Sequence, residues 1–65
     1  MLYSNLDPNG KKIVDEAVQN RRNGASKQKA AEQALSRAQA NGRVGTAFSS
    51  YSDSAIVSAI VSMLD

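Results

Sequence analysis

Large apolar residues are densest in the segment 54–64, which reads Ser-Ala-Ile-Val-Ser-Ala-Ile-Val-Ser-Met-Leu. The segment repeats every four residues, and on a helix this step returns to nearly the same face. Ser54, Ser58 and Ser62 therefore form one narrow polar stripe, which leaves an apolar arc of roughly 240°. Because packing on one core needs an arc of only about 100°, either two neighbours within the fold or a second chain must cover the rest.

A strand is the alternative for this segment, since Ile and Val favour strands. The segment shows no period-two alternation, however, and it is long for a buried strand. Ser50, Ser52 or Asp53 can cap a helix that begins here, so the pattern predicts a helix over 53–64. The apolar run is about half of the ~20 residues that cross a bilayer, and no membrane span is predicted.

Two further helices are predicted over 8–22 and 26–40. Asp7-Pro8 is typical of a helix start, and Ser26 is the expected N-cap of the later helix. An Asn-Gly pair follows each helix as a stop signal, at 23–24 and 41–42. Helical spacing gives the inner stripes as Ile13, Val14, Ala17 and Val18 for the first helix, and Ala31, Ala34, Leu35 and Ala38 for the second.

The segments outside the helices carry the remaining large side chains. Residues 1–6 are expected to form an extended arm that packs across helix ends through Leu2, Tyr3 and Leu6. In the linker 43–52, a short helical turn can begin near Thr46. The linker side chains expected to fill the space between the second and third helices are Val44, Phe48 and Tyr51.

The chain of 65 residues is predicted to be one all-α domain, 1–65, of three helices. A domain this small is marginal alone, and without Cys or His it has no disulfide and no typical zinc site. Oligomerisation through the C-terminal helix is therefore predicted. The expected interface residues are Ala55, Ile56, Ser58, Ala59, Ile60 and Met63. The alternative is a central core helix whose serines face water.

Charge is distributed unevenly along the chain, although the net charge is only +2. Segment 11–43 holds all eight basic residues and three acidic ones, 8 − 3 = +5, whereas 44–65 holds two acidic residues and no base, −2. This asymmetry favours an acidic partner.

Four cations cluster where the first two helices meet, at Arg21, Arg22, Lys27 and Lys29. With Ser26 at a helix N-terminus, they suit a phosphate or a carboxylate. The prediction is an anion-binding tip for an acidic protein or for a nucleic-acid backbone. The alternative is a solvated polar turn.

Catalysis is not predicted, because the common general base and the strongest nucleophile are both absent. Asp15 and Glu16 are adjacent, so on a helix they point about 100° apart and do not form an acid–base pair. Residues 24–27 lack the spacing of a phosphate loop, and no helix-turn-helix is visible. No enzyme activity, cofactor or metal site is expected.

The predicted function is therefore a small non-enzymatic interaction protein, of the regulator or inhibitor type. It would bind an acidic protein partner and form a homo-oligomer through its C-terminal helix. Its size would fit a phage or plasmid protein. A non-specific nucleic-acid binder and a structural subunit of a virion or filament are the alternatives. The first residues do not resemble a signal peptide, so the expected location is the cytoplasm, or the host cytoplasm for a virus-encoded protein.

Overall fold

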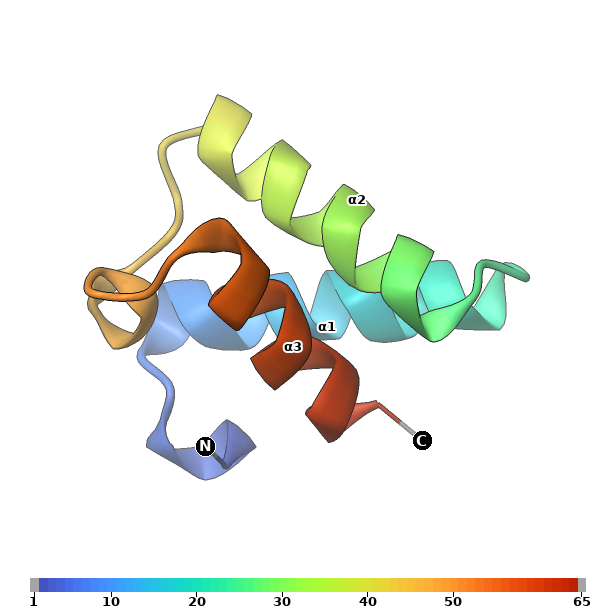
Figure 1. The fold of residues 1–65 in the computed structure, drawn as a ribbon, viewed down its shortest axis with the longest axis horizontal. Helices are drawn as coiled ribbons and strands as arrows, with labels where there is room; N and C mark the ends of the chain where they lie inside the picture. The colour runs from blue at the N-terminus through green and yellow to red at the C-terminus, as the bar shows by residue number, and fades with distance from the viewer. Residues whose placement is uncertain (1, 65) are drawn as a thin grey trace.

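The computed structural model describes residues 2–64, and these form the predicted all-α three-helix domain. The helices are α1 (Pro8–Arg22), α2 (Lys27–Ala40) and α3 (Asp53–Met63). Of two short 3-10 turns, η1 (Tyr3–Asn5) precedes α1, and η2 (Thr46–Phe48) lies in the segment between α2 and α3. Helices α1 and α2 form a hairpin, and α3 packs against both (Figure 1). Within this described range, no helix has both the length and the apolar character required to cross a membrane.

The predicted helix boundaries are confirmed to within one residue. Helix α1 occupies 8–22 as expected, and Ser26 is the N-cap of α2, its Oγ accepting a hydrogen bond from the Lys29 N–H at 3.2 Å. Helix α3 ends at Met63 rather than at 64, because Leu64 has extended backbone angles. The N-cap of α3 is Ser52, the second of the three candidates.

The two Asn-Gly stops work through the same backbone geometry. After α1, the Gly24 N–H donates to the Arg21 carbonyl at 3.1 Å, and the Ala25 N–H donates to the Asn20 carbonyl at 3.2 Å. This pair of bonds is a Schellman motif, which requires a left-handed residue and so favours glycine. The motif recurs at the end of α2, where Gly42 has φ +67°.

Half of the fourteen buried residues belong to the predicted inner stripes of α1 and α2, and the stripe residue Val18 is only half-buried. Helix α2 approaches closely because alanine dominates its inner face and Leu35 is its only large buried residue. The apolar arc of α3 is covered within the chain, since Ile56, Val57 and Ile60 are all buried. The buried residues are Leu6, Ile13, Val14, Ala17, Ala30, Ala31, Ala34, Leu35, Ala38, Phe48, Ile56, Val57, Ile60 and Leu64.

The N-terminal arm differs from the prediction. Tyr3–Asn5 form a 3-10 turn rather than an extended segment, and Leu2 is 67% exposed. The Tyr3 hydroxyl donates to Asp15 Oδ1 at 3.0 Å, and Lys11 Nζ lies 5.7 Å from the centre of the Tyr3 ring. The arm is therefore held to the outer face of α1, and only Leu6 enters the core.

The linker side chains are also only partly as predicted. Phe48 is buried and Val44 is half-buried, but Tyr51 is 41% exposed. The Tyr51 ring packs edge-on against Phe48, with 6.2 Å between the ring centres. Tyr51 therefore covers the core from outside rather than filling it.

Candidate binding site

The basic tip is the turn between α1 and α2, with Arg21 and Arg22 before it and Lys27 and Lys29 after it. The Schellman motif and the Ser26 cap fix the backbone of this turn. Since the helices form a hairpin, the four cations belong to one end of the molecule, as the sequence predicted. No carboxylate within residues 2–64 lies within 4.0 Å of any of the four cationic groups.

Some of the polar groups of the tip already form hydrogen bonds within the turn. Arg21 Nη1 donates to the Ala25 carbonyl at 3.1 Å, so this guanidinium braces the turn. The Ser26 hydroxyl accepts from the Lys29 N–H. The helix N-terminus of α2 therefore has one fewer backbone donor for an anion than the sequence alone implied. The lysine and arginine side chains remain the main source of positive charge.

A groove of about 410 Å³ adjoins the tip and is lined by Val18, Arg21, Arg22 and Met63. Val18 and Met63 are half-buried, whereas both arginines are exposed. The groove thus combines two cations with an apolar floor contributed by the ends of α1 and α3. Sequence reasoning missed it because Met63 lies far from the arginines along the chain, and only the packing of α3 on α1 brings them together.

The residues predicted to form an interface on α3 differ in their exposure. Ile56 and Ile60 are 2% and 0% exposed, so the prediction that they lie on a surface for a second chain is wrong. Ala55 and Ser58 are exposed. Ala59 and Met63 are half-buried. The two isoleucines pack inward because α1 and α2 together cover the broad apolar arc of α3.

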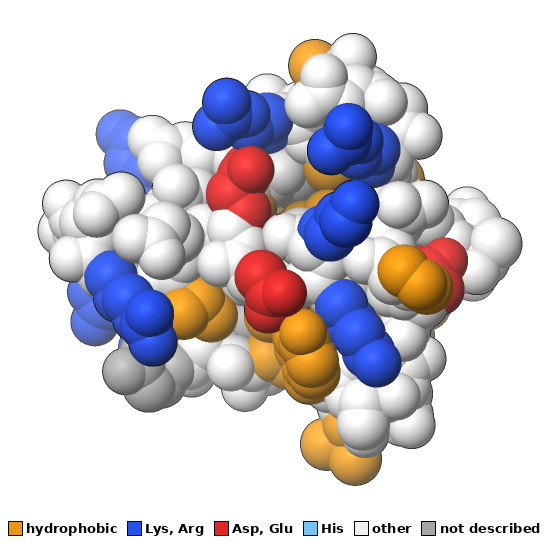
Figure 2. All heavy atoms as spheres, turned by 180° about the vertical axis from the view of Figure 1, so that it is seen from behind, with side chains coloured by type: hydrophobic (Ala, Val, Ile, Leu, Met, Phe, Trp, Pro, Cys, Tyr) orange, Lys and Arg blue, Asp and Glu red, His pale blue; other side chains and the backbone are white. Residues whose placement is uncertain are grey.

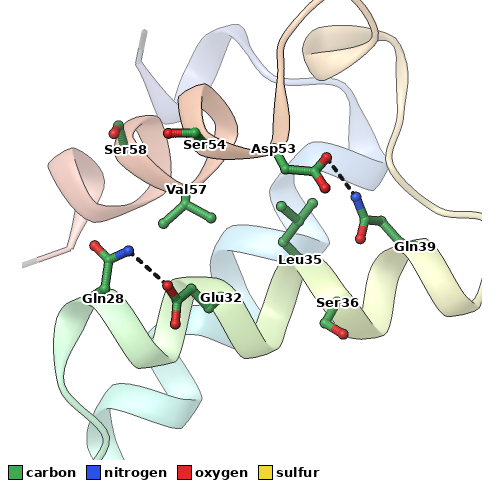
Figure 3. Close-up of a pocket in the computed structure, with 9 residues that line it drawn as sticks. All are labelled: Gln28, Glu32, Leu35, Ser36, Gln39, Asp53, Ser54, Val57 and Ser58. Atoms are coloured by element: carbon green, nitrogen blue, oxygen red, sulfur yellow. Dashed lines mark hydrogen bonds between the residues drawn. The ribbon is translucent and has the colours of Figure 1, made fainter.

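A second groove, of about 360 Å³, separates α2 from α3 (Figure 3). Leu35 and Val57 point toward each other at its base, and polar side chains form its walls. Gln28 Nε2 donates to Glu32 Oε2 at 2.9 Å, and Gln39 Nε2 donates to Asp53 Oδ1 at 2.9 Å. Because the described residues of its lining include two carboxylates and no cation, this groove does not suit an anion. Its lining residues are Gln28, Glu32, Leu35, Ser36, Gln39, Asp53, Ser54, Val57 and Ser58.

The outer face of α1 has acidic side chains between basic groups. Figure 2 shows acidic side chains near the middle of this side of the molecule, with basic side chains around them. The Asp15 carboxylate accepts a hydrogen bond from the Tyr3 hydroxyl, and Glu16 Oε1 lies 3.9 Å from Arg37 Nη1. The face is therefore not a continuous positive stripe.

Groups suited to catalysis or metal binding are sparse. Residues 2–64 contain no cluster of three potential metal ligands. The carboxyl group whose pKa changes most is Asp7, where hydrogen bonds from the Gly10 N–H and from Thr46 lower the pKa to about 2. At neutral pH this carboxyl group is ionised, so it has no proton to donate and is a weaker base than an ordinary carboxylate, and its hydrogen bonds join the start of α1 to Thr46.

No protein-family model matches the chain, and comparisons with characterised proteins and with solved structures find no significant match.

Proposed function

We propose that the protein is a small interaction protein whose basic tip binds an acidic segment of another protein. The observation that supports this proposal is the groove in which Arg21 and Arg22 lie beside Val18 and Met63. A partner segment with one large apolar side chain and neighbouring carboxylates would fill the floor and pair with the arginines. Arginine is well suited to this because its planar fork binds a carboxylate through two hydrogen bonds.

An acidic protein is favoured over a nucleic acid as the partner. A nucleic-acid backbone presents evenly spaced negative charges and would meet Asp15 and Glu16 along the outer face of α1. Stacking of bases requires aromatic rings near the basic groups. None of the three aromatic residues, Tyr3, Phe48 and Tyr51, lines the groove at the tip.

The binding test uses a synthetic helical peptide with leucine on one face and glutamate beside it, measured by fluorescence anisotropy. The variant R21Q/R22Q/K27Q/K29Q should weaken binding by at least about tenfold, because close charge pairs at interfaces contribute more than about 1 kcal/mol. The matched control K11Q/K12Q/R37Q/R43Q removes the same charge from the other basic positions. It should bind with nearly unchanged affinity.

The substitution Met63→Ala separates a groove from a simple positive patch. Peptide binding should weaken in this variant, whereas binding of a peptide with alanine in place of leucine should not change. Equal losses in the two quadruple variants would refute the proposal, because net charge alone would then explain the binding. Tighter binding of a short DNA duplex than of the peptide, lost only in the tip variant, would favour the nucleic-acid alternative.

Self-association through α3 is a second proposal, now restricted to the residues that face outward. The exposed side chains Ala55 and Ser58 are small, and small residues allow two helix backbones to approach closely. Closed dimers would fit an interaction protein, and growth without limit would fit the filament or virion alternative. The cytoplasmic location is also part of the proposal.

A further inference from the structure

A second basic cleft lies at the opposite end of the α1/α2 hairpin from the tip. It has a volume of about 50 Å³, and the first turns of α1 and the end of α2 form its walls. Its floor consists of the buried apolar residues Ile13, Ala34 and Ala38. The polar residues around it are Asn9, Lys12, Glu16, Arg37, Asn41 and Arg43.

The composition of this cleft is that of an anion site. Three cations, Lys12, Arg37 and Arg43, face one carboxylate, Glu16, so the balance is +3 − 1 = +2. The side-chain amides of Asn9 and Asn41 add further donors. One water molecule needs roughly 10–15 Å³ of cavity volume, so the cleft has room for a few waters or for one tetrahedral oxyanion.

The backbone around the cleft is well fixed. Arg43 follows the Schellman motif of α2, and its N–H donates to the Ala38 carbonyl at 2.7 Å. Asp7 caps α1 shortly before Asn9. The amino end of α1 and the carboxyl end of α2 both lie here, so their opposite partial charges largely offset each other. The side-chain charges therefore decide the sign of the potential.

Among the described residues that line the cleft, Glu16 is the only anion, and its hold on Arg37 is weak. The separation of 3.9 Å is near the limit for an ion pair, and the Arg37 side chain is 72% exposed. Such exposed ion pairs contribute little to stability. An arginine has several N–H donors, so Arg37 can bind an oxyanion while Glu16 moves aside.

We infer that this cleft binds a single phosphate group, held by Lys12, Arg37 and Arg43 in competition with Glu16. Arginine and lysine bind phosphate as well as carboxylate, and three cations around one small cleft match the greater charge of a phosphate group. The phosphate can be free or carried by a small phosphomonoester. This inference is independent of the proposed function, because the cleft shares no residue with the tip.

The test is a titration with inorganic phosphate at constant ionic strength, followed by ¹⁵N NMR of the Arg37 and Arg43 side chains and of the Asn9 amide. The wild type should show saturable shifts at these groups. The variant K12Q/R43Q should weaken phosphate binding by at least about tenfold, since it removes two of the three cations and their charge-assisted hydrogen bonds to the anion. The control R22Q/K29Q loses the same charge at the tip and should retain the saturable shifts.

Glu16→Gln provides the sharper test, because it should strengthen phosphate binding by removing the competing carboxylate. Weaker or unchanged binding in this variant would overturn the inference. Non-saturable shifts in the wild type, or equal losses in K12Q/R43Q and R22Q/K29Q, would overturn it as well. Circular dichroism of each variant confirms that the helices are intact.

Two further titrations identify the source of the phosphate. Binding of adenosine monophosphate at least as tight as that of inorganic phosphate, with no gain for a short oligonucleotide, would support a small phosphomonoester. An oligonucleotide that binds much more tightly and depends on the tip residues as well would overturn the single-group site in favour of nucleic-acid binding.

Discussion

Asp7 connects the start of α1 to Thr46, which lies 39 positions later in the chain. Its Oδ1 accepts a hydrogen bond from the Gly10 N–H at 2.8 Å, and its Oδ2 accepts from the Thr46 N–H at 2.6 Å and from Thr46 Oγ1 at 2.7 Å. One carboxylate therefore caps α1 and holds the start of η2 against it. Sequence predicted the cap but not the link to Thr46, because the linker has no signal for where it crosses α1.

The link through Asp7 should make stability depend on acid pH. The pKa is lowered to about 2 in the folded protein from 3.8, chiefly by the Gly10 N–H. The contribution of the carboxylate is therefore complete above about pH 4 and is lost as the pH falls toward about 2. Urea denaturation between these pH values should show the free energy of unfolding falling. Asp7→Asn should be less stable at neutral pH and should lose part of this slope. An identical pH dependence in the variant would contradict the assignment.

Gly45 lies against the same carboxylate. It has φ +85°, and a Cβ atom at this position would lie 2.6 Å from Asp7 Oδ1. Gly45→Ala should therefore destabilise the protein by about 1–3 kcal/mol from backbone strain, with a further cost from the collision. The control Gly24→Ala has the same unfavourable sign of φ, but a Cβ atom at position 24 would have no other atom of the described residues within 4 Å. In urea denaturation, Gly24→Ala should lower the free energy of unfolding by less than Gly45→Ala does. Equal decreases in the two variants would show that the collision with Asp7 adds no cost.

At the scale of the elements, α3 is the helix whose role changed most between sequence and structure. Its repeat of Ser-Ala-Ile-Val gives an apolar arc too broad for one neighbour, and the fold provides two, α1 and α2. Ile60 is fully buried between them, whereas Val61, the next residue, is only half-buried. The helix is therefore mainly a core element. Its serine stripe and Ala55 are exposed, and Ala59, Val61 and Met63 are half-buried.

Truncation of Ile60 should reveal this core role. Ile60→Ala should cost about 2–5 kcal/mol, because it removes buried methyl groups and leaves a cavity. A domain of 65 residues has a total stability of only about 3–10 kcal/mol, so this variant should lose a large part of that stability. Ile60→Val should cost about 0.5–1.5 kcal/mol and remain measurable by thermal denaturation. Val61→Ala should cost less than Ile60→Ala, and a reversed order would contradict the packing described for α3.

At the scale of the whole molecule, the hairpin separates two basic regions by most of the length of α1. The tip combines cations with an exposed apolar groove, and the opposite end has a small cleft suited to one phosphate. Asp15, whose carboxylate accepts a hydrogen bond from Tyr3, lies on α1 between them, and Glu16 lines the cleft. The basic residues that are concentrated in segment 11–43 of the sequence therefore form two separate regions in the structure rather than one patch.

Self-association is tested at this scale by light scattering over a wide concentration range. The wild type should have a molar mass above that of the monomer at high concentration, if the outer face of α3 is an interface. Ser58→Glu should then lower the mass toward the monomer, because a buried unpaired charge is costly. Gln19→Glu adds the same charge on the outer face of α1 and should leave the mass unchanged. A monomeric wild type at every concentration would contradict the proposal.

The sequence by itself determined the helices, their ends and most of the core. These features depend on local signals, namely Asp7-Pro8, Ser26 and the two Asn-Gly pairs, and on apolar spacing along each helix. The sequence also predicted that Arg21, Arg22, Lys27 and Lys29 lie at one end of the molecule, because two helices joined by a short turn usually form a hairpin.

Only the tertiary structure decided which surfaces were left exposed. Whether Ile56 and Ile60 faced a second chain or their own core depended on how many neighbours α3 had, which spacing along one helix cannot specify. The groove at Met63, the cleft at Lys12 and Arg43, and the bond from Thr46 to Asp7 each join residues from different elements. Their formation depends on how the helices cross, and that is set by side-chain packing over the whole core.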